Sequence, residues 1–445
     1  MTNVFHKIGF MCHSIGILMG EYIHYAFSKD YDNTMKNIAD KLARINIFYV
    51  KIFQSLSTNS NILSNELIEY LTIFTDKCPY TDADIDFNFI NTIAQIQDKD
   101  PSLGIQLLSS KPINSGVISL IYEGVLPNGK KVIVKVKRKN IKAKLIKALD
   151  EIEFAIEPIS LFPHIKSLNL KNLFEENKKM MLVQADFKQE IDNINTMNET
   201  NKFIPYVKIP KVYDIFTAEN EDMIVMEYIN GNKLIDVKEE DKEQYSYLLT
   251  KFSIKSILYN GYYHADLHQG NILFIKNDIL SVGEGGEEED ETESDEINHR
   301  LGIIDFGIMW RITREEQNKF YNFFQKLLEG NHYETAKVML DFLIEPREDV
   351  EKLSINDYNM LIKVLEEFVN NVYENEKGFL SPDDIYKINI ALYRYNLKLS
   401  RTFCKIEVSL AISDSVCSNL SVATPFIEIV TKVSNEIFPS SLMDY

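Results

Sequence analysis

Two short segments, HADLHQGN at 264–271 and DFG at 305–307, constrain this chain more than any other part of its sequence. The first places Asp266 five residues before Asn271, and the second adds Asp305 after the apolar run LGII. In phosphoryl transfer from ATP, one carboxylate accepts the proton of the attacking hydroxyl and two further side-chain oxygens hold Mg²⁺. Either segment alone arises by chance, but their order and spacing together predict a site for ATP and Mg²⁺.

A lysine upstream extends this pattern. Segment 119–138 predicts two strands joined by a turn at Pro127, Asn128 and Gly129. The second strand carries Lys135 in VIVK, a sequence that resembles the kinase strand whose lysine contacts the nucleotide phosphates. A lone lysine on a strand is usually an outward charge. Here the order of lysine, HxD, asparagine and DFG favours a role in nucleotide binding.

The pattern along the chain predicts three parts. Residues 1–105 indicate a helical extension, residues 106–230 a small β-rich lobe, and residues 231–445 a mainly helical lobe. We therefore expect an α+β fold of the two-lobed protein kinase-like type, with a small antiparallel sheet lobe, a mainly helical lobe and an N-terminal helical extension. The acidic run at 281–299 carries nine Asp or Glu residues, half of the net charge of -18, and predicts a solvated, disordered loop.

Two further segments concern the adenine base of ATP and the substrate that accepts the phosphoryl group. Strands are predicted at 207–216 and 222–231, and the second resembles the kinase hinge, where backbone groups of Met226 to Tyr228 would contact the adenine. After the DFG segment, Thr313 and Glu316 form a capping-box pattern that opens a helix over 315–328. Protein kinases have a much longer segment ending in A-P-E here, so the usual dock for a peptide substrate is missing.

Composition narrows the class of protein and its surroundings. At 445 residues with 45% hydrophobic side chains, the chain is long enough for a substantial folded core. Its pI near 5.0 and its lack of a basic patch among aromatics argue against nucleic acid as a partner. The four cysteines form no CxxC pair, which favours a reduced intracellular compartment over disulfides or zinc.

The most apolar run, 8–20, is shorter than the roughly 18 residues that suggest a membrane span. It predicts a helix with one stripe of larger apolar residues and one of small residues. The larger residues are Ile8, Met11, Cys12, Ile15, Leu18, Met19 and Tyr22, and the small stripe is Gly9, His13, Gly16 and Gly20. Three interpretations stay open: a buried or docking helix, a helix in peripheral contact with a membrane, and a cleaved targeting segment.

With these residues in view, positions 40 to 315 resemble the UbiB-type atypical kinases, a family that supports ubiquinone synthesis. The likeness is carried by YVKIFQSLSTNSNILSNEL, PINSGVISLIYEGVLPNGKKVIVKVKR, QADFKQEIDN and GYYHADLHQGN. The resemblance implies that Lys135 contacts the phosphates and pairs with Glu190, and that Asp266 is the catalytic carboxylate. It implies that Asn271 and Asp305 hold Mg²⁺, that a loop at Gly116 covers the nucleotide, and that a helix with Lys51 and Gln54 folds over the acceptor side.

Three departures from the family pattern surround this site. Phe53 replaces the glycine of the family's K-x-G-Q segment, and a large ring cannot occupy a position of close backbone approach. Gln184 replaces the first acid of E-x-D, while Asp186 is kept. The family's Ala-rich loop becomes 114–116, Asn-Ser-Gly, which gains a flexible glycine. The phosphate and metal residues are unchanged, which favours a protein that uses ATP.

Three functions are compatible with these residues. The first is an ATPase or phosphotransferase of the UbiB type, acting on an unknown small-molecule, lipid or protein acceptor. The second is a small-molecule kinase of the aminoglycoside or choline kinase type, which also uses an HxDxHxxN-like loop. The third is a catalytically weak nucleotide-binding scaffold or regulator whose output is conformational.

Overall fold

The computed structural model describes residues 4–46, 48, 78–159, 174, 178–179, 181–276, 298–374, 382–420 and 426–437. It divides into two compact units. Unit 1 comprises residues 1–193 and 211–228, and unit 2 comprises residues 194–210 and 229–445. Unit 1 holds an antiparallel sheet and unit 2 is mainly helical, which confirms the α+β, kinase-like fold class.

The sheet of unit 1 has the order β1-β3-β4-β6, with β2 also paired to β3. Its strands are β1 (Gln106–Leu107), β2 (Asn114–Ser115), β3 (Ser119–Val125), β4 (Lys131–Lys137) and β6 (Met223–Glu227). The predicted hairpin over 119–138 is confirmed, since β3 and β4 pair antiparallel from Ser119↔Lys137 to Val125↔Lys131. Gly129 lies in this turn with φ +83°, a backbone conformation that residues other than glycine rarely adopt.

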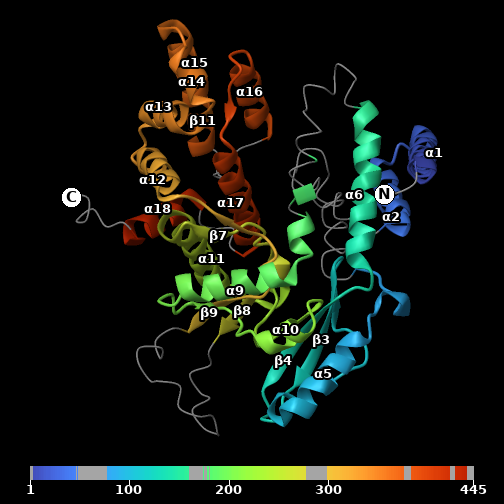
Figure 1. The fold of residues 1–445 in the computed structure, drawn as a ribbon. Helices are drawn as coiled ribbons and strands as arrows, with labels where there is room; N and C mark the ends of the chain where they lie inside the picture. The colour runs from blue at the N-terminus through green and yellow to red at the C-terminus, as the bar shows by residue number, and fades with distance from the viewer. Residues whose placement is uncertain are drawn as a thin grey trace. The chain divides into compact units, whose positions relative to one another are not determined.

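Helix α5 (Asn88–Lys99) lies across the face of β3 and β4, as Figure 1 shows. Its apolar face contributes Phe89, Ile93 and Ile96 to a core that also contains Tyr122 and Val134. The rings of Phe89 and Tyr122 are 5.1 Å apart between centroids. Burying such aromatic and aliphatic side chains is the main favourable term in folding, so this contact holds the sheet as a fixed platform.

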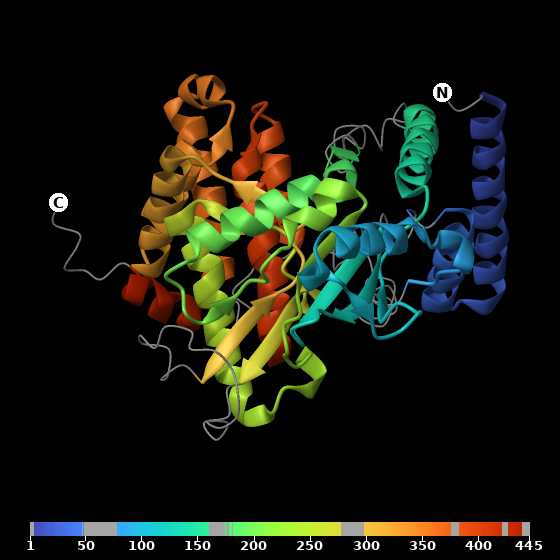
Figure 2. The same cartoon turned by 60° about the horizontal axis from the view of Figure 1, so that its bottom comes forward.

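The remaining described helices of unit 1 are α1 (Val4–Ser28), α2 (Tyr31–Ile45), α6 (Ile141–Ile159), α9 (Phe187–Thr200, which continues into unit 2) and α10 (Asp214–Glu219). Helices α1 and α2 lie side by side in Figure 2. The run 8–20 is helical as predicted, but its larger residues face outward. Ile15, Met19 and Tyr22 are exposed, whereas Glu21 is buried. This inversion is possible because Lys41 of α2 donates to the Glu21 carboxylate at 2.5 Å.

The small stripe of α1 also lies open. A methyl group added at Gly9, Gly16 or Gly20 would meet no atom within 4 Å. The interpretation of this segment as a buried helix is therefore wrong for both stripes, whereas its interpretation as a docking helix stays a prediction. Lys7, the other charged residue of α1, lies 3.9 Å from Asp150 of α6. Lys7 and Glu21 thus face the neighbouring helices, and the outward surface, which also exposes His13 and His24, carries no Asp, Glu, Lys or Arg.

The strand predicted at 207–216 is only partly correct. Its first residues form β5 (Val207–Lys208), whereas Asp214–Glu219 form helix α10. Pro210 has no N–H to give to a sheet, and an acidic residue at position 214 suits the first turn of a helix. The extended segment between them keeps one isolated bridge, Val212↔Met226.

Unit 2 is built around α11 (Glu239–Lys255) and α17 (Arg401–Leu420), which pack against each other. Its short helical turns are η3 (Leu234–Asp236), η4 (Ser256–Asn260, a π-helix) and η5 (Gln269–Asn271). Its other helices are α12 (Arg314–Leu328), α13 (His332–Phe342), α14 (Arg347–Glu351), α15 (Ile355–Glu374), α16 (Pro382–Tyr393) and α18 (Phe426–Ile437). Its strands are β5, β7 (Tyr262–His264), β8 (Ile272–Lys276), β9 (His299–Ile303), β10 (Met309–Arg311), β11 (Ile344–Glu345) and β12 (Lys398–Leu399). The capping box of α12 is confirmed.

Strands β8 and β9, visible as a ribbon pair in Figure 2, flank the acidic run. They pair as far as Lys276↔His299, so His299 belongs to a strand and not to the predicted loop at 281–299. Asp241 of α11 accepts from Lys276 Nζ at 2.6 Å and from His299 Nε2 at 2.8 Å. These contacts close the base of the hairpin. Residues 281–297, the segment 51–54 and residues 64–77 of the predicted helical extension lie outside the described residues.

Candidate nucleotide site

In unit 1 the first group of predicted residues is the pair Lys135–Glu190. Lys135 projects from the middle of β4, between Ile121 of β3 and Ile224 of β6 in register. Asp186 accepts from the N–H groups of residues 188 and 189 and so caps α9, which places Glu190 in the first turn of that helix. Lys135 Nζ lies 2.6 Å from Glu190 Oε1, and both side chains are at least nine-tenths buried. An ammonium in this position is fixed in direction and charge.

The other predicted nucleotide residues of unit 1 lie at sheet edges. Gly116 precedes β3 and donates its N–H to Ser119 O at 2.9 Å, which closes a tight turn. Met226 is buried in β6. The N–H groups of Glu227 and Tyr228 donate to Lys211 O and Lys131 O at 2.8 and 3.2 Å. Two of the donors in the predicted hinge are therefore already used, one by β4 and one by the extended segment at Lys211.

In unit 2 the catalytic-loop segment is organised by His264. Its Nε2 lies 2.6 Å from Asp305 O, and its Nδ1 accepts from the N–H of Asp266 at 3.1 Å. Because a carbonyl only accepts, Nε2 carries the proton and the ring is neutral. Burial lowers the pKa of His264, which agrees with this state. One imidazole thus ties the backbone of Asp266 to the backbone of Asp305.

Asn271 and Asp305 are also held by the loop. Asn271 Nδ2 donates to Asp266 O at 2.8 Å, which directs the amide oxygen away from this contact. Asn271 O accepts from Ile304 N at 3.1 Å, and Asp305 Oδ1 accepts from Gly307 N at 3.0 Å. The structure therefore brings Asp266, Asn271 and Asp305 into one hydrogen-bond network.

Two supporting residues of this segment were not predicted from the sequence. His264 stands first in the HxD motif, so its presence was visible, but the motif does not state which atoms it joins. Ser409 of α17 donates to His264 O at 2.8 Å and is 145 positions away in the chain. No sequence signal marks it, because only the packing of α17 places it behind the catalytic loop.

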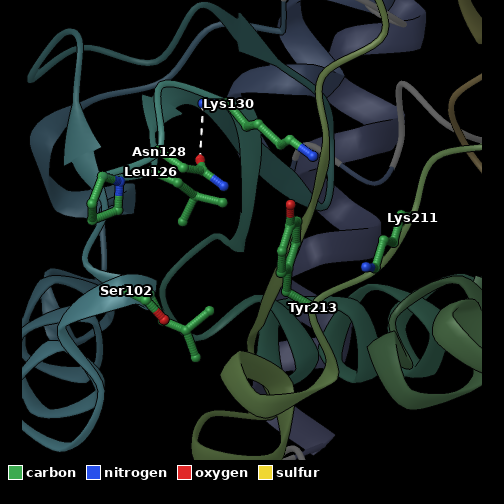
Figure 3. Close-up of a pocket in the computed structure, with 8 residues that line it drawn as sticks. Ser102, Leu126, Asn128, Lys130, Lys211 and Tyr213 are labelled. Atoms are coloured by element: carbon green, nitrogen blue, oxygen red, sulfur yellow. Dashed lines mark hydrogen bonds between the residues drawn. The ribbon is translucent and has the colours of Figure 1, made fainter. Parts of the chain in front are cut away.

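A separate open pocket of about 460 Å³ lies on unit 1, shown in Figure 3. It is lined by Ser102, Leu103, Leu126, Pro127, Asn128, Lys130, Lys211 and Tyr213. Four of these residues belong to the β3–β4 turn region, whereas Gly116 and Lys137 lie at the opposite end of the same two strands. The pocket therefore contains none of the predicted nucleotide residues.

The family model for the ABC1 atypical kinase-like domain matches residues 74–339, more than half of the chain. The chain belongs to this family. The match confirms the UbiB-type assignment, and family members include AarF domain-containing protein kinases. The matched range contains every predicted site residue from Gly116 to Asp305.

The chain is similar to several known proteins. An uncharacterized protein of Synechocystis sp. is 27% identical over 54% of this chain and 62% of its own length. The AarF domain-containing protein kinase 1 of Xenopus laevis is 23% identical over 52% of this chain and 44% of its own. The Rv3197–erythromycin complex of Mycobacterium tuberculosis matches with a TM-score of 0.48 and 15% identity, covering 87% of this chain and 98% of that one. The chain spans less than two thirds of the length of the Synechocystis and Xenopus relatives.

Among the described residues, no helix combines the length and apolar character that crossing a membrane requires. The described residues also contain no cluster of three or more His, Cys, Asp or Glu side chains arranged to hold a metal ion.

Proposed function

We propose that this ABC1-family protein binds ATP with Mg²⁺ and transfers the γ-phosphoryl group to water or to a small or lipid-like hydroxyl acceptor. The observation that carries the proposal is the hydrogen-bond network of unit 2, in which neutral His264 joins the backbones of Asp266 and Asp305. Phosphoryl transfer depends mainly on positioning and on charge stabilisation. A loop held at both aspartates meets that requirement.

Each predicted residue has a role in this proposal. Lys135, oriented by Glu190, neutralises phosphate charge. Asp266 accepts or orients the acceptor hydroxyl, and its side chain is about one third exposed, so that an acceptor can reach it. Gly116 lets its loop approach the phosphates, and backbone groups of 226–228 would contact the adenine base.

The donor atoms of Asn271 and Asp305 fit Mg²⁺. Asn271 uses its amide nitrogen for Asp266 O, which leaves the amide oxygen to face a cation. Asp305 supplies a carboxylate. Mg²⁺ prefers oxygen ligands and usually takes one or two from the protein, with phosphates and waters completing the set. The ion would neutralise charge on the phosphates during transfer.

The segment after the DFG motif favours a small acceptor over a peptide. Only Ile308 separates Gly307 from β10, which pairs with β7 through Met309↔His264. Helix α12 then begins at Arg314, capped by Thr313. The short segment between Gly307 and α12 is therefore held by the catalytic strand, whereas protein kinases use a long segment here to receive a peptide.

The test is nucleotide binding and turnover by purified protein with Mg²⁺ and labelled ATP. We expect Asp305→Asn to abolish ADP formation and Lys135→Ala to weaken MgATP binding at least about tenfold. Asp236→Asn and Lys139→Ala, which remove exposed charges of the same kind from the same units, serve as controls. If binding survives both site variants unchanged, the site assignment is wrong.

The products separate the alternatives. Tight MgATP binding with no turnover would favour the scaffold or regulator. Stimulation of ADP release by a lipid or phenol extract would favour the UbiB-type activity, whereas stimulation by aminoglycosides or choline would favour the small-molecule kinase.

We infer in addition that α1 provides a peripheral membrane contact. Its outward surface exposes Ile8, Ile15, Leu18, Met19, Tyr22, Ile23 and Phe27. Both charged side chains of the helix, Lys7 and Glu21, face α6 and α2 instead. A 25-residue helix whose outward face exposes large apolar side chains and no Asp, Glu, Lys or Arg matches the interface between headgroups and acyl chains, where apolar and aromatic side chains insert without crossing the bilayer.

Sedimentation with phosphatidylcholine vesicles tests this contact. We expect Ile15→Ser with Met19→Ser to lower the fraction bound at least about fivefold, since each removes an apolar side chain from the contact. Ile235→Ser removes an isolated, highly exposed apolar side chain of unit 2 and should have no effect. If the double variant binds vesicles as well as the wild type does, the membrane contact is contradicted. It is also contradicted if the wild type forms a dimer without lipid and the double variant does not.

A further inference from the structure

Arg138, the residue directly after β4, has contacts that the nucleotide-site prediction does not use. It is 3% exposed, yet it carries a charge that burial penalises. Burial lowers its pKa, but a guanidinium stays protonated in proteins. A buried arginine is tolerated only where acceptors satisfy its N–H groups, so the identity of its acceptors shows what it holds in place.

The acceptors belong to two separate segments. In the nucleotide loop, Nε donates to Gly116 O at 2.9 Å and one terminal nitrogen donates to Ser115 Oγ at 2.8 Å. In the N-terminal extension, the terminal nitrogens donate to Pro79 O at 3.0 Å and to Cys78 O at 3.2 Å. An ion pair with Asp84 at 3.5 Å completes the set. Five contacts match the five N–H donors of a guanidinium.

The same two segments also bond directly to each other. Cys78 N donates to Ser115 O at 2.7 Å, and Ser115 Oγ donates to Cys78 O at 2.8 Å. Ser115 and Cys78 are both buried. The loop end at Gly116 therefore cannot move away from the extension without breaking these bonds and leaving buried donors unpaired, which is costly.

We propose that Arg138 is the positioning residue of the nucleotide loop, and that through it the segment Cys78–Pro79 of the N-terminal extension sets the loop's grip on the nucleotide phosphates. The proposal rests on the nucleotide-binding function proposed above. Lys135 lies three residues earlier, on β4, and Arg138 follows the end of that strand, so one element positions both the phosphate-binding ammonium and the residue that holds the loop. A change in the extension would then alter phosphate affinity, and bound nucleotide would in turn stabilise the extension.

A lysine cannot replace Arg138 in this role. An ammonium has three donors on one atom, whereas the acceptors here surround a planar group with donors on three nitrogens. Arg138→Lys keeps the charge and Arg138→Gln removes it. Ser115→Ala removes only one acceptor and one donor, and is the mild variant if either arginine variant fails to fold. Lys139→Gln removes an exposed charge at the next position and is the control.

Amide hydrogen exchange without nucleotide tests the contact directly. We expect exchange at Gly116 and Cys78 to be about 10- to 100-fold faster in Arg138→Gln and Arg138→Lys, several-fold faster in Ser115→Ala, and unchanged in Lys139→Gln. Wild-type exchange rates at both amides in all three site variants would overturn the proposal. This measurement does not depend on catalysis.

Binding then tests positioning. We expect the Kd for MgATP to rise at least about tenfold in Arg138→Gln while the Kd for adenosine, which lacks phosphates, changes less than twofold. Saturating MgADP should slow exchange at Cys78 in the wild type but not in Arg138→Gln. Equal loss of both affinities, or no effect of MgADP on Cys78 in the wild type, would overturn it. If Lys135→Ala leaves MgATP affinity unchanged, the proposed function fails instead, and the nucleotide-free exchange still decides the role of Arg138.

Discussion

The buried pair Lys135–Glu190 should be the most sensitive ion pair described in unit 1. Its atoms are 2.6 Å apart, and the two side chains are 8% and 2% exposed. Glu190→Gln keeps the size of the side chain but removes the charge that compensates a buried ammonium. Removing one partner of a buried pair costs about 3–5 kcal/mol, whereas replacing both by apolar groups is often neutral.

A matched pair in the same unit provides the control. Lys99 and Glu219 lie 2.8 Å apart but are 62% and 41% exposed. Because solvent screens such a pair, Glu219→Gln should cost less than about 1 kcal/mol. The chemical change is the same in both variants, so the difference measures burial.

The assay is amide hydrogen exchange in β4, because the single tryptophan, Trp310, lies in unit 2 and reports on that unit. A loss of about 3–5 kcal/mol corresponds to exchange that is about a hundredfold to a few thousandfold faster at protected amides. Lys135→Met with Glu190→Leu should restore most of the protection. The reasoning is refuted if Glu190→Gln costs no more than Glu219→Gln, or if the double variant is as unstable as the single one.

Three further predictions concern backbone conformation, packing and the β8–β9 base. Gly261→Ala should lower the free energy of unfolding in urea by about 2–3 kcal/mol, since φ is +64° and the new methyl group would lie 2.6 Å from Gln317 Nε2. Gly129→Ala should lower it by about 1 kcal/mol, because φ is also positive there but the methyl group would meet no atom within 4 Å. Equal costs would contradict this. Iodoacetamide should modify two cysteines in the native protein and all four after unfolding, because burial raises the pKa of two thiols to about 11. The exposed pair is Cys12 and Cys404, and the buried pair is Cys78 and Cys417. Burial raises the pKa of Asp241, but hydrogen bonds from Lys276 and His299 outweigh it and lower that pKa overall. The contribution of Asp241 to stability is therefore present above about pH 4 and is lost as the pH falls through the pKa of Asp241 in the folded protein. Asp241→Asn should thus reduce the stability monitored by Trp310 by about 1–3 kcal/mol at pH 7 and by less at pH 3. The same loss at both pH values would argue against this contact.

The sequence predicted the local elements well where one short segment contains all of the determining groups. The turn at Gly129 needs only turn residues between two alternating strands, and the cap at Thr313 needs only Glu316 three residues later. The segment 207–216 was mistaken because its apolar content suits a strand, while Pro210 and Asp214 favour a helical turn. In this segment the local signals of Pro210 and Asp214 indicated the structure better than the apolar content did.

The outward surface of α1 shows the limit of periodicity. The spacing of Ile8, Ile15 and Tyr22 predicts one apolar face, but it does not say whether protein or solvent meets that face. Lys41 in α2 and Asp150 in α6 orient the helix by pairing with its two charges. These partners lie on other helices, so the choice of face belongs to tertiary packing.

The sequence by itself determined which chemical groups this protein holds. The order and spacing of Lys135, Asp266, Asn271 and Asp305 predict a phosphoryl-transfer set, and the chain matches an atypical kinase-like domain over the range that contains them. Only the tertiary structure showed what holds them. Ser409 and Arg138 act through contacts between segments distant in the chain, and hydrogen bonds of this kind depend on atomic distance and burial, which spacing along a sequence does not contain.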